Sequence, residues 1–159
     1  MTKKRYFLSL ILFFSIVVTA LAGGVGTWKN YLAYSDVQWV EEGSNKLYVL
    51  ASNSLYTYNK NDQSIKTYDK VNGLSDTDIR FIAWNKTARR LVIIYSNNNI
   101  DLLDDRGNVT NVPDYYLKTT MADKTINGID MSGVYCYLST GFGLVKLNVA
   151  KAEISDSYN

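Results

Sequence analysis

Short hydrophobic runs separated by polar turns cover most of the chain. Within residues 72–105, apolar runs at 79–84, 91–95 and 100–103 are separated by a polar break and an Asn-rich turn. Runs of this length, bounded by Asn and Gly, are typical of β-strands joined by tight turns. The stretch therefore predicts three consecutive strands.

The same order of runs appears before and after this stretch, so the chain contains three similar units. Each unit has an opening run, a strongly apolar second run, a third run after a small-residue turn, and a weaker, more polar fourth run. The landmarks recur every 42 to 47 residues: Val37, Ile79 and Ile126 begin the first runs, and Leu47, Leu91 and Val134 begin the second. Four short strands at a period in the forties are the signature of a β-propeller blade.

The repeats predict an all-β fold, a partial β-propeller of about three four-stranded antiparallel blades. We expect blades at about residues 36–70, 78–114 and 125–159, with an extra N-terminal strand at 26–34. Closed propellers have about four to eight blades, so three units predict an open arc with unpaired edges. We accordingly expect residues 23–159 to form the N-terminal part of a longer propeller, or a truncated product.

The first 22 residues indicate a secretory signal peptide, which would be helical. Three cations at residues 3–5 precede a short apolar core, and residues 20–22 (ALA) form a small-x-small cleavage site. We expect cleavage between Ala22 and Gly23 and export to the periplasm or the outer-membrane surface. A retained membrane anchor is the alternative, but the apolar stretch is shorter than the about 20 residues that span a bilayer.

Composition and charge exclude several classes of function. Without the three leader cations, the net charge of +2 becomes about −1, which does not favour nucleic-acid binding. The chain has no His, which excludes Ser-His-Asp and Cys-His triads and removes the commonest transition-metal ligand. Its single Cys, Cys136, lies in an apolar run and predicts a buried side chain, not a reactive thiol. We expect no catalytic residue, no metal and no cofactor.

Acidic pairs are the remaining candidates for chemistry. Asp76 with Asp78, and Asp104 with Asp105, lie in predicted turns, where Asp accepts local backbone hydrogen bonds. Catalysis or calcium binding is the alternative, although residues 104–108 lack the spacing of a calcium loop. Glycosylation sequons begin at Asn85 and Asn108 and are too common to indicate function.

Aromatic side chains suggest a binding surface. Trp28, Trp39 and Trp84 lie in strand-like runs, which favours packing between blades over stacking on a carbohydrate. The longest connection between units, residues 114–124, contains Tyr115 and Tyr116. Because loops carry binding residues more often than scaffold strands do, we predict that this pair is exposed and contacts a partner.

Several motifs resemble known propeller families. The stretch containing Gly73, Leu74, Ser75 and Ile79 resembles the repeat of two-component-regulator propellers. Residues 26–34 (GTWKNYLAY), the turn at 95–96 and residues 139–158 (STGFGLVKLNVAKAEISDSY) resemble the N-terminal propeller of the PorZ family, from the type IX secretion system. The third unit departs from the repeat, because residues 121–125 replace its Gly-Leu-Ser start.

The resemblance implies a non-catalytic scaffold or adaptor in a cell-surface attachment complex. It implies a PorU-like sortase and PorV/PorQ-like β-barrels as partners, with lipopolysaccharide as a further candidate. It also implies a second propeller and a C-terminal sorting β-sandwich beyond residue 159. Two other classes of function stay open. One is the sensor propeller of a hybrid two-component regulator that binds a polysaccharide or other ligand, and the other is an enzyme with catalytic residues in further blades.

Overall fold

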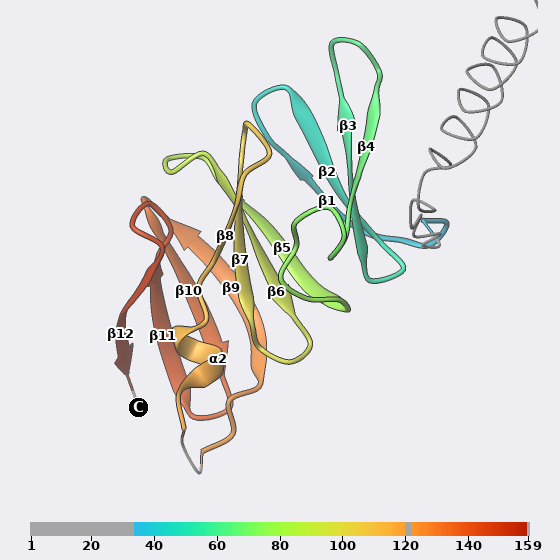
Figure 1. The fold of residues 1–159 in the computed structure, drawn as a ribbon. Helices are drawn as coiled ribbons and strands as arrows, with labels where there is room; N and C mark the ends of the chain where they lie inside the picture. Colours follow the sequence, from blue (N-terminus) through green and yellow to red (C-terminus); the bar gives the residue numbers. More distant parts are fainter. Residues whose placement is uncertain (1–33, 120–121, 159) are drawn as a thin grey trace, which may run out of the picture. The chain divides into compact units, whose positions relative to one another are not determined.

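The computed structural model describes residues 34–119 and 122–158. The expected signal peptide, its cleavage site at Ala22 and Gly23, and residues 26–33 of the expected N-terminal strand lie outside the described residues. Twelve strands and one short helix make up the regular structure of the described part, which confirms the all-β prediction (Figure 1).

The strands form three four-stranded antiparallel sheets, each in sequence order. Blade 1 contains β1 (Val37–Glu42), β2 (Lys46–Ala51), β3 (Ser54–Asn59) and β4 (Ile65–Tyr68). Blade 2 contains β5 (Ile79–Asn85), β6 (Arg90–Tyr95), β7 (Ile100–Asp104) and β8 (Val109–Asn111). Blade 3 contains β9 (Ile126–Ser132), β10 (Tyr135–Thr140), β11 (Gly143–Asn148) and β12 (Glu153–Tyr158), and helix α2 (Asp114–Leu117) precedes it. The predicted partial propeller is confirmed, and blade 2 lies between the other two in Figure 1.

Strand β6 is buried on both faces, as its continuous apolar run predicts. Residues 91–95 are all 0% exposed. Leu91, Ile93 and Tyr95 join the core that blade 2 shares with blade 1, whereas Val92 and Ile94 join the core shared with blade 3. Because successive side chains of a strand point to opposite faces, one strand contributes to both cores. Each fully buried Leu or Ile contributes about 1.5–3 kcal/mol to folding.

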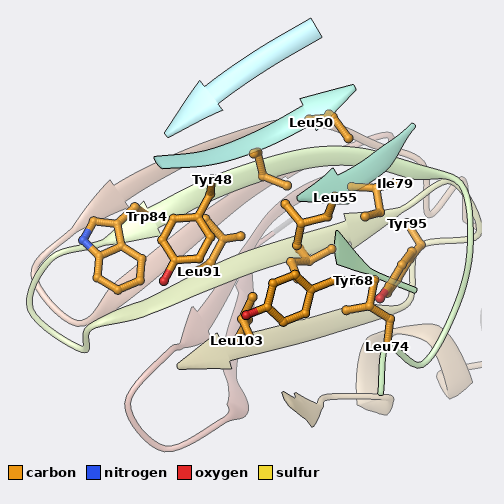
Figure 2. Packing of buried hydrophobic residues seen from close by; sticks show 12 residues of the cluster. Tyr48, Leu50, Leu55, Tyr68, Leu74, Ile79, Trp84, Leu91, Tyr95 and Leu103 are labelled. Carbon is orange, nitrogen blue, oxygen red and sulfur yellow. The ribbon is translucent and has the colours of Figure 1, made fainter. Parts of the chain in front are cut away.

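Aromatic and aliphatic side chains close the core between blades 1 and 2 (Figure 2). The rings of Tyr48 and Trp84 stack at a centroid distance of 5.2 Å, which confirms inter-blade packing for Trp84. Gly43 lies beside this stack, and a Cβ at Gly43 would lie 2.7 Å from the Tyr48 ring. The second core, between blades 2 and 3, contains Cys136, which is buried as expected.

A buried polar network fixes the Gly-Leu-Ser segment to blade 2. The Asp101 carboxylate is fully buried and accepts hydrogen bonds from Tyr95 Oη at 2.6 Å and from the Ser75 backbone N–H at 2.8 Å. Its second oxygen accepts from Asn111 Nδ2 at 2.8 Å. Leu74, next to Ser75, is buried in the core between blades 1 and 2. The loop that leads from blade 1 into blade 2 is therefore held by both a side chain in the core and a backbone hydrogen bond.

Asn side chains at two turns join each blade to the next. In the β2–β3 turn, Asn53 has φ 58° and exchanges hydrogen bonds with Ile79, the first residue of β5. In the β6–β7 turn, Asn98 has φ 68° and its Oδ1 accepts from the Ile126 N–H, at the start of β9. Asn tolerates this left-handed conformation better than most residues. In blade 3, Phe142 occupies the corresponding turn.

The first strand of every blade contains a β-bulge near its start. The extra residues are Gln38 in β1, Arg80 in β5 and Asn127 in β9, each skipped by the pairing of its strand with the next. All three side chains are exposed. A bulge redirects the side chain of its extra residue, and bulges occur often beside functional sites. The repeat thus places one polar side chain at the same position in each blade.

Candidate functional site

A groove of about 580 Å³ lies over the first strands of the three blades. Its lining includes Trp39, Leu50, Arg80, Phe81, Ile82 and Ile129. Ligand pockets typically measure about 300–1,000 Å³ and are mostly apolar with a few polar groups. The groove has this size and composition, and two of the bulge residues, Gln38 and Arg80, line it.

Trp39 presents its ring to the groove. The residue is 58% exposed, so the predicted packing of Trp39 between blades is wrong. Its Nε1–H donates to Glu41 Oε1 at 2.7 Å, and Glu41 Oε2 accepts from the Trp84 backbone N–H at 3.0 Å. The Glu41 carboxylate therefore orients the indole and ties β1 to β5, and it leaves the Trp39 ring face as an apolar platform.

Arg80 supplies the positive charge of the groove. Its guanidinium lies 5.2 Å from the centroid of the Phe81 ring, a cation–π contact. In the described part of the chain, no carboxylate lies within ion-pair distance of Arg80. Guanidinium presents its donors in a planar fork that matches a carboxylate. Sequence reasoning missed this residue, because nothing in the local pattern marks the bulge.

The predicted pair Tyr115 and Tyr116 is divided by the structure. Tyr115 is buried, its Oη donates to the Lys124 carbonyl at 2.7 Å, and its ring stacks on Phe142 at 6.4 Å. Burial raises the pKa of Tyr115 above its ordinary value. Tyr116 is 45% exposed, and Leu117 beside it is 65% exposed. The expectation of an exposed aromatic is thus correct only for Tyr116, and its contact with a partner stays a prediction.

The acidic candidates make local contacts in their turns. Asp76 accepts from Asn97 Nδ2 and from the Thr77 N–H. Asp104 Oδ1 accepts from the backbone N–H groups of Arg106 at 2.9 Å and Asn108 at 2.8 Å. Burial raises the pKa of Asp104, but hydrogen bonds from the turn outweigh burial, so the pKa lies below its ordinary value.

The other acidic residues and the sequon at Asn85 add no site. Asp105 forms an ion pair with Arg89 at 2.5 Å, and Asp78 adopts φ 60° in its turn. Within residues 34–119 and 122–158, no three His, Cys, Asp or Glu side chains are grouped so as to hold a metal ion. Asn85 is 1% exposed and its Nδ2 donates to the Gly133 carbonyl, so its role is structural.

The blades, their inter-blade Asn contacts and the groove over their first strands define a β-propeller domain. The family model described as "TSS9, PorZ, N-terminal beta-propeller domain" matches residues 47–159, and the chain belongs to this family. No curated protein sequence matches the chain. Over the described residues, no helix is long and apolar enough to span a membrane.

Solved structures of three proteins show the same architecture. PorZ of Porphyromonas gingivalis, described as an essential bacterial surface component of the type IX secretion system, is 38% identical with a TM-score of 0.77. The match covers 84% of this chain and 18% of that chain, so this chain spans less than a fifth of that PorZ. The extracellular domain of BT4673 from B. thetaiotaomicron has 15% identity and a TM-score of 0.59, and the match covers 84% of this chain and 18% of that chain. AztD from Citrobacter koseri has 15% identity and a TM-score of 0.59, and the match covers 77% of this chain and 33% of AztD. At 15% identity, the matches to BT4673 and AztD show a shared fold alone.

Proposed function

We propose that the protein is a non-catalytic, PorZ-like component of a type IX secretion complex at the cell surface. The observation that carries this proposal is the family match over residues 47–159, together with 38% identity to P. gingivalis PorZ. Residues 1–22 would direct export, and residues 23–159 would contribute blades to a propeller that holds partner proteins in place.

The proposed partners are a PorU-like sortase and PorV/PorQ-like barrels, with lipopolysaccharide as a further ligand of the assembly. We place one protein contact at α2, where Tyr116 and Leu117 are exposed beside each other. Tyr115, buried against Phe142, anchors this single helical turn to blade 3. Exposed aromatic and aliphatic side chains on an anchored loop are typical of protein–protein contacts.

The contacts of the acidic side chains support a non-catalytic scaffold function. The carboxylates of Asp76, Asp104 and Asp105 bind turn residues or Arg89, which gives each of them a structural role. A sensor role for the propeller would resemble BT4673, but 15% identity extends that likeness to the fold only. We therefore prefer the secretion assignment to the sensor.

Affinity capture from envelope extracts of the native bacterium tests the proposal. Full-length tagged protein is expected to recover the PorU-like sortase, and the double substitution Tyr116→Ser with Leu117→Ser is expected to reduce the recovery at least fivefold. Val71→Ser is the matched control, because Val71 is 64% exposed in the loop between β4 and β5, away from α2. Absence of sortase with the unmodified protein would contradict the proposed function. Equal recovery with the double variant would contradict only the placement of the contact at α2.

A further inference from the structure

We propose that the groove over β1, β5 and β9 binds an acidic peptide segment. In this assignment an aromatic or large aliphatic side chain of the peptide packs on Trp39 and Phe81, and a neighbouring carboxylate pairs with Arg80. The inference goes beyond the secretion assignment and does not depend on it, since it concerns only the chemistry of the groove.

The apolar part of the groove favours a hydrophobic side chain. Trp39 offers an open ring face, and the partly exposed Phe81, Ala83 and Ile129 supply apolar surface around it. An aromatic side chain of the ligand would gain a ring–ring contact with Trp39 in addition to the burial of its apolar area. Because Glu41 already accepts the indole N–H, Trp39 offers its ring face and no hydrogen-bond donor.

The amide side chains of the groove are already bonded to each other. Gln38 Oε1 accepts from the Asn53 backbone N–H at 2.9 Å, and Gln38 Nε2 donates to Asn53 Oδ1 at 3.3 Å. Asn53 Nδ2 donates to the Ile79 carbonyl at 3.2 Å. A sugar carries many hydroxyl groups that each need a partner on burial. The groove therefore offers few free side-chain partners for the hydroxyl groups of a carbohydrate.

Arg80 is the charged group that selects the ligand. It lies on a bulge, its guanidinium stays over the Phe81 ring, and it forms no ion pair with the described residues. Glu41, the acidic residue in the lining, is committed to Trp39 and to the Trp84 backbone. A carboxylate that accepts two guanidinium N–H groups would complement this positive charge while the rest of the ligand lies on the apolar wall.

The size and position of the groove suit a short segment of peptide. A groove of about 580 Å³ is within the range that holds a small ligand, and it is open along the first strands of all three blades. An acidic residue next to an aromatic one presents both required groups within one dipeptide. The preferred occupant is consequently a segment in which Phe, Tyr or Trp adjoins Asp or Glu.

Titration calorimetry with the intact protein tests the assignment. The probe is the acetylated tetrapeptide amide Gly-Phe-Asp-Gly, the uncharged comparison is Gly-Phe-Asn-Gly, and glucuronate is the carbohydrate comparison. We expect the acidic peptide to bind about tenfold more tightly than the Asn peptide, which corresponds to the loss of one charge-assisted hydrogen bond. It should also bind more tightly than glucuronate, which has a carboxylate for Arg80 but no aromatic ring for Trp39 and Phe81. Arg80→Gln should weaken the acidic peptide about tenfold and leave the Asn peptide unchanged.

Arg106→Gln is the matched control, because it removes the same charge from an exposed residue in the β7–β8 turn, outside the groove. Trp39→Ala should weaken both peptides at least threefold. Equal effects of Arg80→Gln and Arg106→Gln, tighter binding of glucuronate, or no binding of the acidic peptide at millimolar concentration would each overturn the proposal. Since Arg80 and Trp39 are exposed, neither substitution removes a core side chain, and circular dichroism checks that each variant is folded.

Discussion

The buried carboxylate of Asp101 gives the sharpest prediction for stability. Asp101 is 0% exposed, and its three hydrogen bonds come from Tyr95, Ser75 and Asn111. Asp101→Asn keeps the shape of the side chain and removes its charge. An amide oxygen can still accept from Tyr95 and Ser75, but the amide nitrogen then faces the Nδ2 of Asn111, which is also a donor.

The expected loss in the free energy of unfolding follows from these contacts. A hydrogen bond to a charged group contributes about 1.5–3 kcal/mol and a neutral one about 0.5–1.5 kcal/mol, so two weakened bonds lose about 2 kcal/mol. The lost bond to Asn111 adds about 1 kcal/mol, although Asn111 keeps its bonds to Asn99 Oδ1 and the Ile100 carbonyl. Burying a neutral amide costs less than burying a charge, which offsets part of the loss. We expect Asp101→Asn to lower the free energy of unfolding by about 2 kcal/mol, and Tyr95→Phe by about 1.5–3 kcal/mol.

Denaturant unfolding followed by Trp fluorescence measures both changes, because Trp84 lies in the same core as Tyr95. The denaturant concentration at the midpoint of unfolding should fall, while the slope of the free energy of unfolding against denaturant concentration stays constant. Asp130→Asn is the control, since Asp130 is exposed on β9 and should change stability by less than about 0.5 kcal/mol. A double-mutant cycle of Asp101→Asn with Tyr95→Phe should show coupling. If Asp101→Asn behaves like the control, the reasoning about this network is refuted.

Three further predictions concern the β2–β3 turn and the two cores. Asn53→Ala should destabilise the protein by about 1–2 kcal/mol in the same assay, because it breaks the contact with Ile79 and places Ala at φ 58°, while Asn61→Ala in the exposed β3–β4 turn should have little effect. Tyr48→Phe should leave stability unchanged or raise it by up to about 1 kcal/mol, because the Tyr48 hydroxyl is buried and has no hydrogen-bond partner among the described residues; a clear loss would argue for a contact at that hydroxyl. Burial, with a smaller contribution from Asp130, raises the pKa of the Cys136 thiol to about 12. The unfolded thiol ionises near pH 8.5, so the stability contributed by the neutral buried thiol is complete below that pH and is lost as the pH rises towards 12. Unfolding measured between pH 8 and pH 10.5 should therefore show a steeper loss for the native protein than for Cys136→Ala, and parallel curves would contradict this.

The strands were predictable because their signals are local. The apolar run at 91–95 needs both of its faces covered, and the period of 42 to 47 residues requires a similar neighbour on each side. The turns were predictable for a related reason, since Asn53 and Asn98 adopt the left-handed conformation that Asn tolerates. These two features were enough to predict four-stranded blades without knowledge of any contact.

The groove was not predictable, because it depends on contacts between strands distant in the sequence. The bulge at Arg80 arises from the register of β5 against β6, and no residue type near Arg80 marks it. Trp39 and Trp84 lie in similar apolar runs, yet Trp84 is 7% exposed and Trp39 is 58% exposed. The burial of Tyr115 likewise requires Phe142 from the β10–β11 turn, which no pattern within residues 114–124 reveals.

Native-state hydrogen exchange of individual amides tests the blade architecture most directly. We predict that the amides of Val92, Ile93 and Ile94 exchange more slowly than any in β12, because β6 is paired on both edges and covered on both faces, whereas β12 is paired only with β11. Amides of β2 and β10, the corresponding strands of the other blades, should follow β6 in protection. Exchange of β6 as fast as that of β12 would contradict the packing of blade 2 between blades 1 and 3.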